Sequence, residues 1–151
     1  MNKIIRKIQY SEKVYRFDVE APLIAKSRKA GNFVIIRVDA NSERMPLTIA
    51  DADIEKGTIT LVVQKVGLSS TKLCNLNEGD EIHDVVGPLG NPTHIENFGT
   101  VLCAGGGVGV APMLPIIKAL KAAGNRVLSV IAGRSKDLVI MEDEVRASSD
   151  E

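Results

Sequence analysis

The sequence has 151 residues, of which 44% are hydrophobic and 3% aromatic, and its 19 basic side chains balance 19 acidic ones. This length suits one domain or two small ones with a real core, and the interspersed charges lack the basic surface by which proteins bind nucleic acid or anionic membranes. Composition therefore argues against a nucleic-acid partner and against a membrane partner.

The N-terminal segment lacks the pattern of a secretion signal. Lys3, Arg6 and Lys7 interrupt its apolar positions, whereas a signal peptide needs an unbroken apolar stretch. No apolar run in the chain is long enough to cross a bilayer. The sequence therefore predicts a cytoplasmic protein.

Six short β-like segments occupy the first two thirds of the chain. Turn residues such as Gly31-Asn32 and Glu78-Gly79-Asp80 separate them, which predicts a small six-stranded antiparallel barrel. In the second segment Val14, Arg16 and Asp18 alternate with apolar side chains, so we expect one face of this strand to lie in water. The predicted strands are Ile4 to Tyr10, Val14 to Glu20, Asn32 to Asp39, Arg44 to Ala50, Thr58 to Val66 and Glu81 to Val86.

The segment from Ser69 to Leu76 breaks the β pattern and predicts a short helix. Ser69 or Ser70 is placed to cap its start, which offers free amides to an anion. An ordinary capped turn is the alternative.

A Gly- and Pro-rich segment from Gly87 to Asn97 precedes a change of periodicity, which predicts a domain boundary near Phe98, with domains 1–97 and 98–151. The second domain is a β-α-β unit with strand Thr100 to Ala104, helix Pro112 to Ala123 and strand Arg126 to Ala132. Within the helix Leu114, Ile117 and Leu120 are expected inward, and Lys118 and Lys121 outward. A last helix is predicted over Asp137 to Arg146, with Met141 in the core and Glu142, Asp143 and Glu144 on a solvated face.

This α/β lobe is shorter than a nucleotide domain usually is. A doubly wound domain commonly has about five parallel strands, and the chain ends after two. We therefore expect a partial lobe, with the C-terminal part missing.

A glycine loop lies between the first parallel strand and its helix. Gly105, Gly106, Gly107 and Gly109 leave the backbone bare, and Pro112 suits the first helical position, so free amides and the positive end of the helix dipole meet at this loop. The loop matches neither G-x-G-x-x-G nor the P-loop. It predicts a pyrophosphate site, with a bare turn as the alternative.

The sequence predicts no metal site. Cys74 and Cys103 lie too far apart for a C-x-x-C motif and are expected to be free thiols, and His83 and His94 are isolated.

Five phrases together resemble the flavoproteins of the ferredoxin–NADP reductase superfamily, closest to two electron-transfer subunits. These are the small subunit of NADH-dependent ferredoxin–NADP oxidoreductase, also called sulfide dehydrogenase, and the dihydroorotate dehydrogenase electron-transfer subunit. The phrases are RMPLTIAD, VVQKVG, VVGPLGNP, CAGGGVGVAPMLP and AGRSKDLVIMEDE.

The resemblance implies an FAD site on the barrel. Thr48 would act at the reacting end of the flavin, where its hydroxyl can exchange hydrogen bonds with the ring atom N5; a plain β-branched strand residue is the alternative. The implied FAD-binding residues are Arg44, Pro46, Leu47, Thr48, Val62, Val63, Gln64, Gly67, Ser69, Ser70 and Thr71.

The resemblance also implies a pyridine-nucleotide site on the second lobe, formed by Gly105, Gly106, Gly107, Val108, Gly109, Pro112, Arg134 and Ser135. Arg134, Ser135 and Lys136 favour the 2′-phosphate of NADP, whereas Asp137 suits NAD. Relatives carry a [2Fe–2S] cluster on four cysteines, for which this chain has no ligands.

The predicted function is an NAD(P)H-dependent electron-transfer subunit. It would move a hydride between NAD(P)H and FAD and pass electrons to ferredoxin or to a larger flavin or iron–sulfur subunit. One alternative is a truncated, non-catalytic flavin- or nucleotide-binding module. Another is a nucleotide-binding regulatory domain without flavin.

Overall fold

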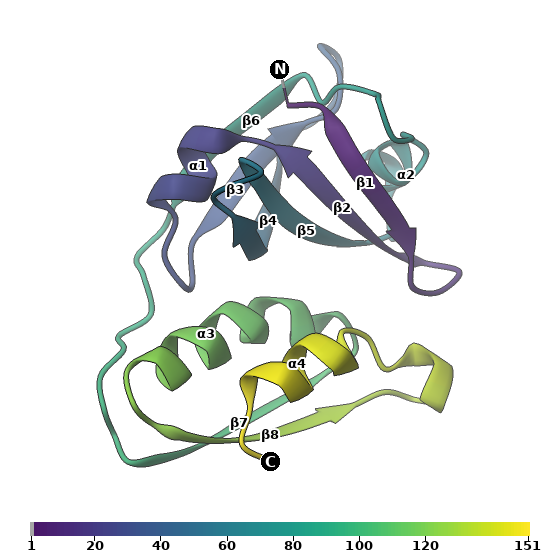
Figure 1. Ribbon diagram of the computed structural model, residues 1–151. Coiled ribbons are helices and arrows are strands. Elements are labelled where there is room, and N and C mark those ends of the chain that lie inside the picture. The colour runs from purple at the N-terminus through teal and green to yellow at the C-terminus, as the bar shows by residue number, and fades with distance from the viewer. Residues whose placement is uncertain (1) are drawn as a thin grey trace.

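The computed structural model describes residues 2–151 and confirms the predicted architecture, an antiparallel six-stranded sheet followed by a two-stranded parallel sheet with helices (Figure 1). The strand order in the first sheet is β1-β2-β5-β4-β3-β6. Its strands are β1 (Ile4–Gln9), β2 (Val14–Glu20), β3 (Phe33–Arg37), β4 (Met45–Asp53), β5 (Thr58–Gln64) and β6 (Asp84–Leu89).

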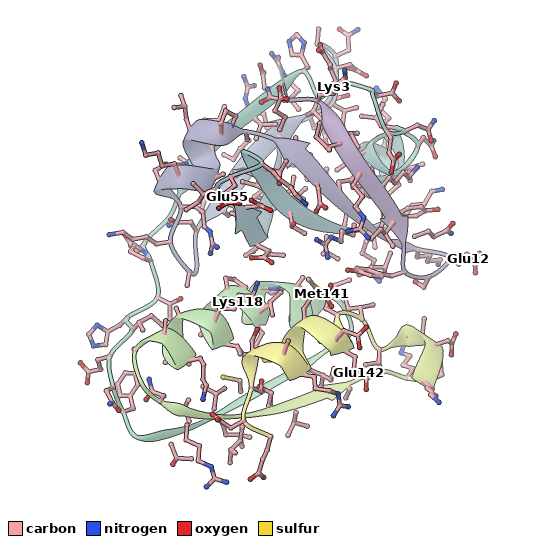
Figure 2. All side chains as sticks on the ribbon, in the orientation of Figure 1. Lys3, Glu12, Glu55, Lys118, Met141 and Glu142 are labelled. Atoms are coloured by element: carbon pink, nitrogen blue, oxygen red, sulfur yellow. The ribbon has the colours of Figure 1, made fainter. Side chains whose placement is uncertain are left out.

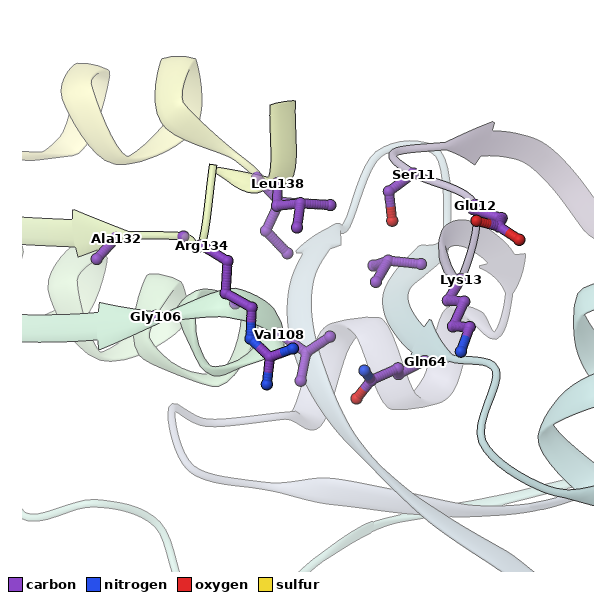
Figure 3. A pocket seen from close by; sticks show the side chains of 13 residues that line it. Ser11, Glu12, Lys13, Gln64, Gly106, Val108, Ala132, Arg134 and Leu138 are labelled. Atoms are coloured by element: carbon purple, nitrogen blue, oxygen red, sulfur yellow. The ribbon is translucent and has the colours of Figure 1, made fainter. Parts of the chain in front are cut away.

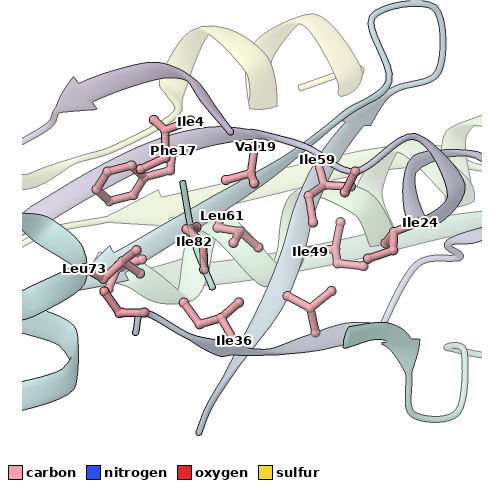
Figure 4. Packing of buried hydrophobic residues seen from close by; sticks show 14 of the residues in the cluster. Ile4, Phe17, Val19, Ile24, Ile36, Ile49, Ile59, Leu61, Leu73 and Ile82 are labelled. Atoms are coloured by element: carbon pink, nitrogen blue, oxygen red, sulfur yellow. The ribbon is translucent and has the colours of Figure 1, made fainter. Parts of the chain in front are cut away.

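Backbone hydrogen bonds close this sheet into a barrel. The Ile4 amide donates to the Asp80 carbonyl at 2.8 Å, and the Ile82 amide donates to the Asn2 carbonyl at 3.1 Å. The strand predicted over Glu81 to Val86 begins three residues later, at Asp84, and Glu81 forms an isolated antiparallel bridge with Lys3. The enclosed core is aliphatic apart from Phe17 and Cys74 (Figure 4), and its fully buried members include Phe17, Val19, Ile36, Ile49, Ile59, Leu61, Leu73 and Ile82.

Two short helices accompany the barrel, and the sequence predicted only one of them. Helix α1 (Pro22–Ser27) was missed, since six residues are too few to show a helical period, although Pro22 stands at its first turn, where proline is favoured. Helix α2 (Leu68–Cys74) was predicted one to two residues too late. Its N-cap is Gly67 rather than Ser69 or Ser70.

The second lobe is a parallel β-α-β unit, as predicted. It comprises β7 (Thr100–Gly106), a 3₁₀ turn η1 (Gly107–Gly109), α3 (Val110–Ala122), β8 (Arg126–Ala132), a second 3₁₀ turn η2 (Lys136–Leu138) and α4 (Glu142–Ser148). Strands β7 and β8 pair in parallel register from Thr100↔Arg126 to Gly106↔Ala132.

Three boundaries in this lobe differ from the prediction. Strand β7 includes Gly105 and Gly106, because both pair with β8. Helix α3 starts at Val110, so Pro112 is its third residue rather than its first. Helix α4 starts at Glu142 rather than Asp137, because Met141 adopts a left-handed conformation with φ 57°.

Helices α3 and α4 lie between the barrel and the β7–β8 sheet (Figure 1). One apolar cluster joins Ala50 of β4 to Leu114 and Ile117 of α3. Lys118, expected to point into solvent, faces the barrel (Figure 2), and its Nζ lies 2.8 Å from Asp51 Oδ2. The two lobes therefore share a packed interface with ion pairs at its edge.

The face of β2 that was expected to lie in water is covered by the second lobe. The side chains of Arg16 and Asp18 are only 13% and 14% exposed. The side chains alternate as predicted, but Arg16 meets Glu144 of α4, and Arg16 and Asp18 line a cavity with Lys118 of α3 instead of lying on an open surface.

The opposite face of the β7–β8 sheet is open. Leu102 is 67% exposed and Val130 is 55% exposed, although parallel sheets are normally covered on both faces. The chain end lies along β8, where the Ser129 amide donates to the Glu151 carbonyl at 2.8 Å.

The predicted boundary near Phe98 falls in the segment between β6 and β7, which contains no helix or strand; the division into domains stays a prediction. Across residues 2–151, the helices are too short or too polar to span a bilayer.

Candidate functional site

A pocket of about 720 Å³ lies between the lobes, where the ends of β7 and β8 meet the barrel. Figure 3 shows Arg134 and Val108 on one side of it and Gln64, Lys13 and Ser11 on the other. Its remaining walls come from residues 12, 14, 106–107, 132–133, 138 and 140. The position agrees with the rule that ligands of α/β sheets bind at the carboxyl ends of parallel strands.

Strand pairing brings the barrel side of this pocket together. Val14 pairs with Gln64, which places the β1–β2 turn beside the end of β5. Ile49 pairs with Leu61 in antiparallel register, so Thr48 lies at the same end of the β4–β5 pair as Gln64. Strand β5 also contacts the η1 turn. The end of β5 therefore lies beside the glycine loop, whereas β4, which starts at the same end of the pair, contributes no residue to the pocket wall.

The glycine loop presents bare backbone. Gly107 has φ 55°, a conformation that L side chains rarely adopt, and a Cβ atom at Gly107 or Gly109 would meet no atom within 4 Å. A Cβ at Gly105 would lie 3.1 Å from Met113 Sδ, so this glycine serves packing. The loop is thus open at Gly107 and closed against α3 at Gly105.

The start of α3 is suited to an anion. No side chain caps it, and no acidic residue lies in its first turn. The Val110 amide already donates to carbonyls of the η1 turn, so the positive end of the helix dipole is what favours a ligand here. Pro112, half-buried as the third helical residue, removes one amide and does not line the pocket. The geometry favours a phosphate at this position.

The β4 residues expected to hold FAD differ in exposure. Arg44 is exposed and precedes β4, and Pro46 is also exposed. Leu47 and Thr48 are half-buried, and Leu47 packs on the barrel core. Thr48 pairs with Phe33 of β3.

On β5 the expected residues alternate between the two sides of the strand. Val63 is 2% exposed inside the barrel core, so only its backbone can meet a ligand. Val62 packs against the cluster between the lobes. Gln64 is exposed and reaches the pocket.

The turn from Gly67 to Thr71 does not line the pocket. Ser70 is 5% exposed, and its hydroxyl accepts hydrogen bonds from the amides of Val66 at 3.0 Å and Gly67 at 2.9 Å. The Ser70 hydroxyl thus braces the turn. Ser69 and Thr71, both half-buried, carry the other hydroxyls of the turn.

After β8, the structure brings Arg134 to the pocket but leaves Ser135 outside its walls. Both residues are exposed. The Ser135 hydroxyl lowers the pKa of the exposed Asp137 carboxyl, with a backbone amide adding to the effect. Asp137 is therefore ionised at neutral pH, close to the site proposed for the ribose.

Eight residues of the pocket wall were not among the predicted site residues: Ser11, Glu12, Lys13, Val14, Ala132, Gly133, Leu138 and Ile140. Ser11 and Lys13 lie in a hairpin turn with no motif. The sequence predicted that Leu138 and Ile140 lie in a helix. Only the long-range pairing of β2 with β5 and the left-handed Met141 place them here.

Within residues 2–151, no three His, Cys, Asp or Glu side chains gather as a metal site would require. Cys74 is buried and Cys103 half-buried, and both are free thiols, as expected. Burial raises the pKa of each.

The fold is that of the ferredoxin–NADP reductases. A cytochrome P450 reductase from Amycolatopsis has the same fold, with a TM-score of 0.78 at 21% identity over 97% of this chain and 47% of its own. No protein-family model matches the sequence.

The chain is homologous to electron-transfer subunits of this class. It is 47% identical over 150 residues to a Thermotoga maritima homologue of the electron-transfer subunit of dihydroorotate dehydrogenase B (NAD⁺), covering 99% of this chain and 53% of that protein. It is 45% identical, with a TM-score of 0.96, to a chain of an NADH-dependent reduced ferredoxin–NADP oxidoreductase solved in work on flavin-based electron bifurcation; the match covers 99% of this chain and 54% of that one. The chain thus spans about half the length of these relatives.

Proposed function

We propose that this chain binds FAD on its barrel and NAD(P)H on its second lobe and serves as an electron-transfer unit. The observation that carries the proposal is the pocket between the lobes, into which the bare glycine loop opens opposite Gln64 at the end of β5. The homology to electron-transfer subunits supports the same reading.

The residues present fit FAD at the β4–β5 end of the barrel. The backbone of Val62 and Val63 and the side chains of Arg44, Pro46 and Leu47 would bind and orient the ring system. Gly67, Ser69 and Thr71 would meet the pyrophosphate, while the Ser70 hydroxyl keeps its place inside the turn. FAD, when bound, accepts a hydride from NAD(P)H and releases electrons one at a time.

Thr48 is the proposed catalytic residue. Its hydroxyl would hold a hydrogen bond to the reacting edge of the flavin in either redox state, since a hydroxyl both donates and accepts. Gln64 would fix the orientation of the ring from the neighbouring strand. The chain contributes positioning and exclusion of water rather than an acid or a base.

The pyridine nucleotide would place its pyrophosphate against residues 105–109 and the start of α3. Arg134 and Ser135 would lie near the adenosine ribose. A cation there favours NADP and the ionised Asp137 favours NAD, so the site suits either nucleotide.

The partner would be ferredoxin or a larger flavin or iron–sulfur subunit, by analogy with the complexes named for the relatives. A [2Fe–2S] cluster, if the pathway uses one, would sit outside this chain, which has two cysteines in all. A cytoplasmic location stays a prediction.

The test is the visible spectrum of the purified chain incubated with FAD. We expect bound FAD to give a yellow protein that NADH or NADPH bleaches in the absence of oxygen. Thr48→Val should keep FAD and slow bleaching about tenfold or more, in the range of lost hydrogen-bond positioning. Thr100→Val, at the far end of β7, is the matched control.

Each alternative has its own result. FAD that binds but stays oxidised under excess NAD(P)H supports a non-catalytic module. Adenine-nucleotide binding without any affinity for FAD supports a regulatory domain and refutes the proposal.

A further inference from the structure

A side-chain ion pair joins β2 of the barrel to α4 of the second lobe. Arg16 lies on the outer face of β2, and its Nη1 donates to Glu144 Oε1 at 3.0 Å. The two side chains are 13% and 33% exposed. This is a hydrogen-bonded ion pair between the lobes, with a largely buried arginine and a glutamate that is one-third exposed.

Hydrogen bonds within the barrel orient the guanidinium plane of Arg16 independently of Glu144. Arg16 Nε donates to Asp18 Oδ1 at 3.1 Å. The same oxygen accepts the Thr60 hydroxyl of β5 at 2.7 Å, and Asp18 and Thr60 are direct partners across the β2–β5 pair. Because guanidinium is planar and its donors have fixed directions, this arrangement decides where Nη1 points.

Glu144 lies a few residues along the chain from the wall of the pocket. It lies in the first turn of α4, three residues after Met141, whose left-handed backbone sets the helix start. Met141 is 3% exposed between α4 and the barrel (Figure 2). Just before it, Leu138 and Ile140 line the pocket. A shift of Glu144 therefore moves the pocket wall.

Other contacts between the lobes are less suited to fix an orientation. Apolar contacts such as that of Ala50 with α3 are not directional. The Lys118–Asp51 pair ends on a flexible lysine that is 40% exposed. Arg16 alone among these contacts combines burial with a fixed donor direction.

We propose that the Arg16–Glu144 pair sets the orientation of the second lobe on the barrel, and so the alignment of the two ligand sites across the pocket. Its relevance to hydride transfer rests on the proposed function, whereas its effect on lobe orientation does not. Both residues are positioning residues. Because Glu144 is one-third exposed, the pair should add little stability, and its effect is expected on geometry.

The test compares two glutamates on the same helix. Glu144→Ala removes the contact between the lobes. Glu142→Ala, the matched control, removes an acid from the same helical turn, but Glu142 is 57% exposed and pairs only within α4, with Arg146. Glu144→Gln keeps an oxygen that accepts from Arg16 and should rescue most of the geometry.

The first measurement needs no cofactor. Spin labels on cysteines at Lys56 of the barrel and Lys136 of the second lobe, both exposed, report the distance between lobes in a Cys103→Ser background. We expect Glu144→Ala to shift or broaden the distance distribution, and Glu142→Ala to leave it unchanged. Equal distributions in all variants would overturn the proposal.

The second measurement is the rate of flavin reduction by NAD(P)H at saturation. We expect Glu144→Ala to lower it about tenfold with unchanged FAD affinity, because misalignment near 1 Å can cost up to about a hundredfold. A normal rate would overturn the link to hydride transfer. If no variant binds FAD, the proposed function fails while the distance measurement still decides the role of the pair.

Discussion

Two glycines of one loop should respond in opposite ways to the same substitution. Gly107 has φ 55°, whereas Gly109 has φ −64° in the helical region, and a Cβ would meet no atom within 4 Å at either. Steric exclusion is therefore absent at both positions. Only the backbone conformation distinguishes them.

The magnitudes follow from that difference. A left-handed conformation costs a non-glycine residue about 1–2 kcal/mol, so Gly107→Ala should destabilise the chain by about that amount. Gly109→Ala needs no change of conformation and should stabilise by about 0.4–1 kcal/mol, because alanine has less entropy to lose on folding. The two variants should differ by about 2 kcal/mol.

Equilibrium unfolding in urea measures this difference. With a slope of about 2 kcal/mol per molar urea, the midpoints of the two variants should lie about 1 M apart, on either side of the parent chain. Equal midpoints, or a Gly109→Ala variant less stable than Gly107→Ala, would refute the backbone argument. Unfolding in the absence of any nucleotide keeps this test separate from ligand binding.

Three further predictions concern other parts of the chain. Among residues 2–151 the buried Tyr10 hydroxyl makes no hydrogen bond of normal geometry, and burial raises its pKa, although the neighbouring Arg16 guanidinium opposes this rise. Tyr10→Phe should therefore cost less than about 1 kcal/mol of stability in urea unfolding, and a larger loss would show that the contact with Arg16 is a full hydrogen bond. Hydrogen bonds from the Ser42 hydroxyl, which has the larger effect, and from Lys72 of α2 lower the pKa of the exposed Asp39 carboxyl from 3.8 to about 2. The contact between Asp39 and Lys72 should therefore be complete above pH 3.8 and be lost as the pH falls through about 2. An NMR titration that gives Asp39 a pKa near 3.8 would contradict this. Leu102→Ser, on the open face of the β7–β8 sheet, should change stability by less than about 0.5 kcal/mol and lower the binding of a hydrophobic dye. Unchanged dye binding would show that the dye does not bind to this face of the sheet.

The sequence predicted the order and type of most elements because their patterns are local. Turn residues separated all six barrel strands, and a left-handed Gly124 with φ 93° follows α3 where the helix was expected to stop. The six-residue helix α1 was missed because its buried residues, Ile24 and Ala25, are too few to show a period.

The sequence predicted the glycine loop but not the pocket into which it opens. Glycines, a following helix and a preceding apolar strand are neighbours in the chain, so their chemistry can be read directly. Ser11 and Lys13 reach the same pocket only because β2 pairs with β5, and no local pattern encodes that distant partner.

By itself the sequence determined a β barrel followed by a β-α-β unit, a bare-backbone loop at the start of a helix, and the resemblance to reductase flavoproteins. Only the tertiary structure decided that the polar face of β2 is an interface rather than a wet surface, and that Arg16 meets Glu144 across it. The physical reason is that alternation shows which side chains share a face, whereas what covers that face depends on contacts between residues more than a hundred positions apart.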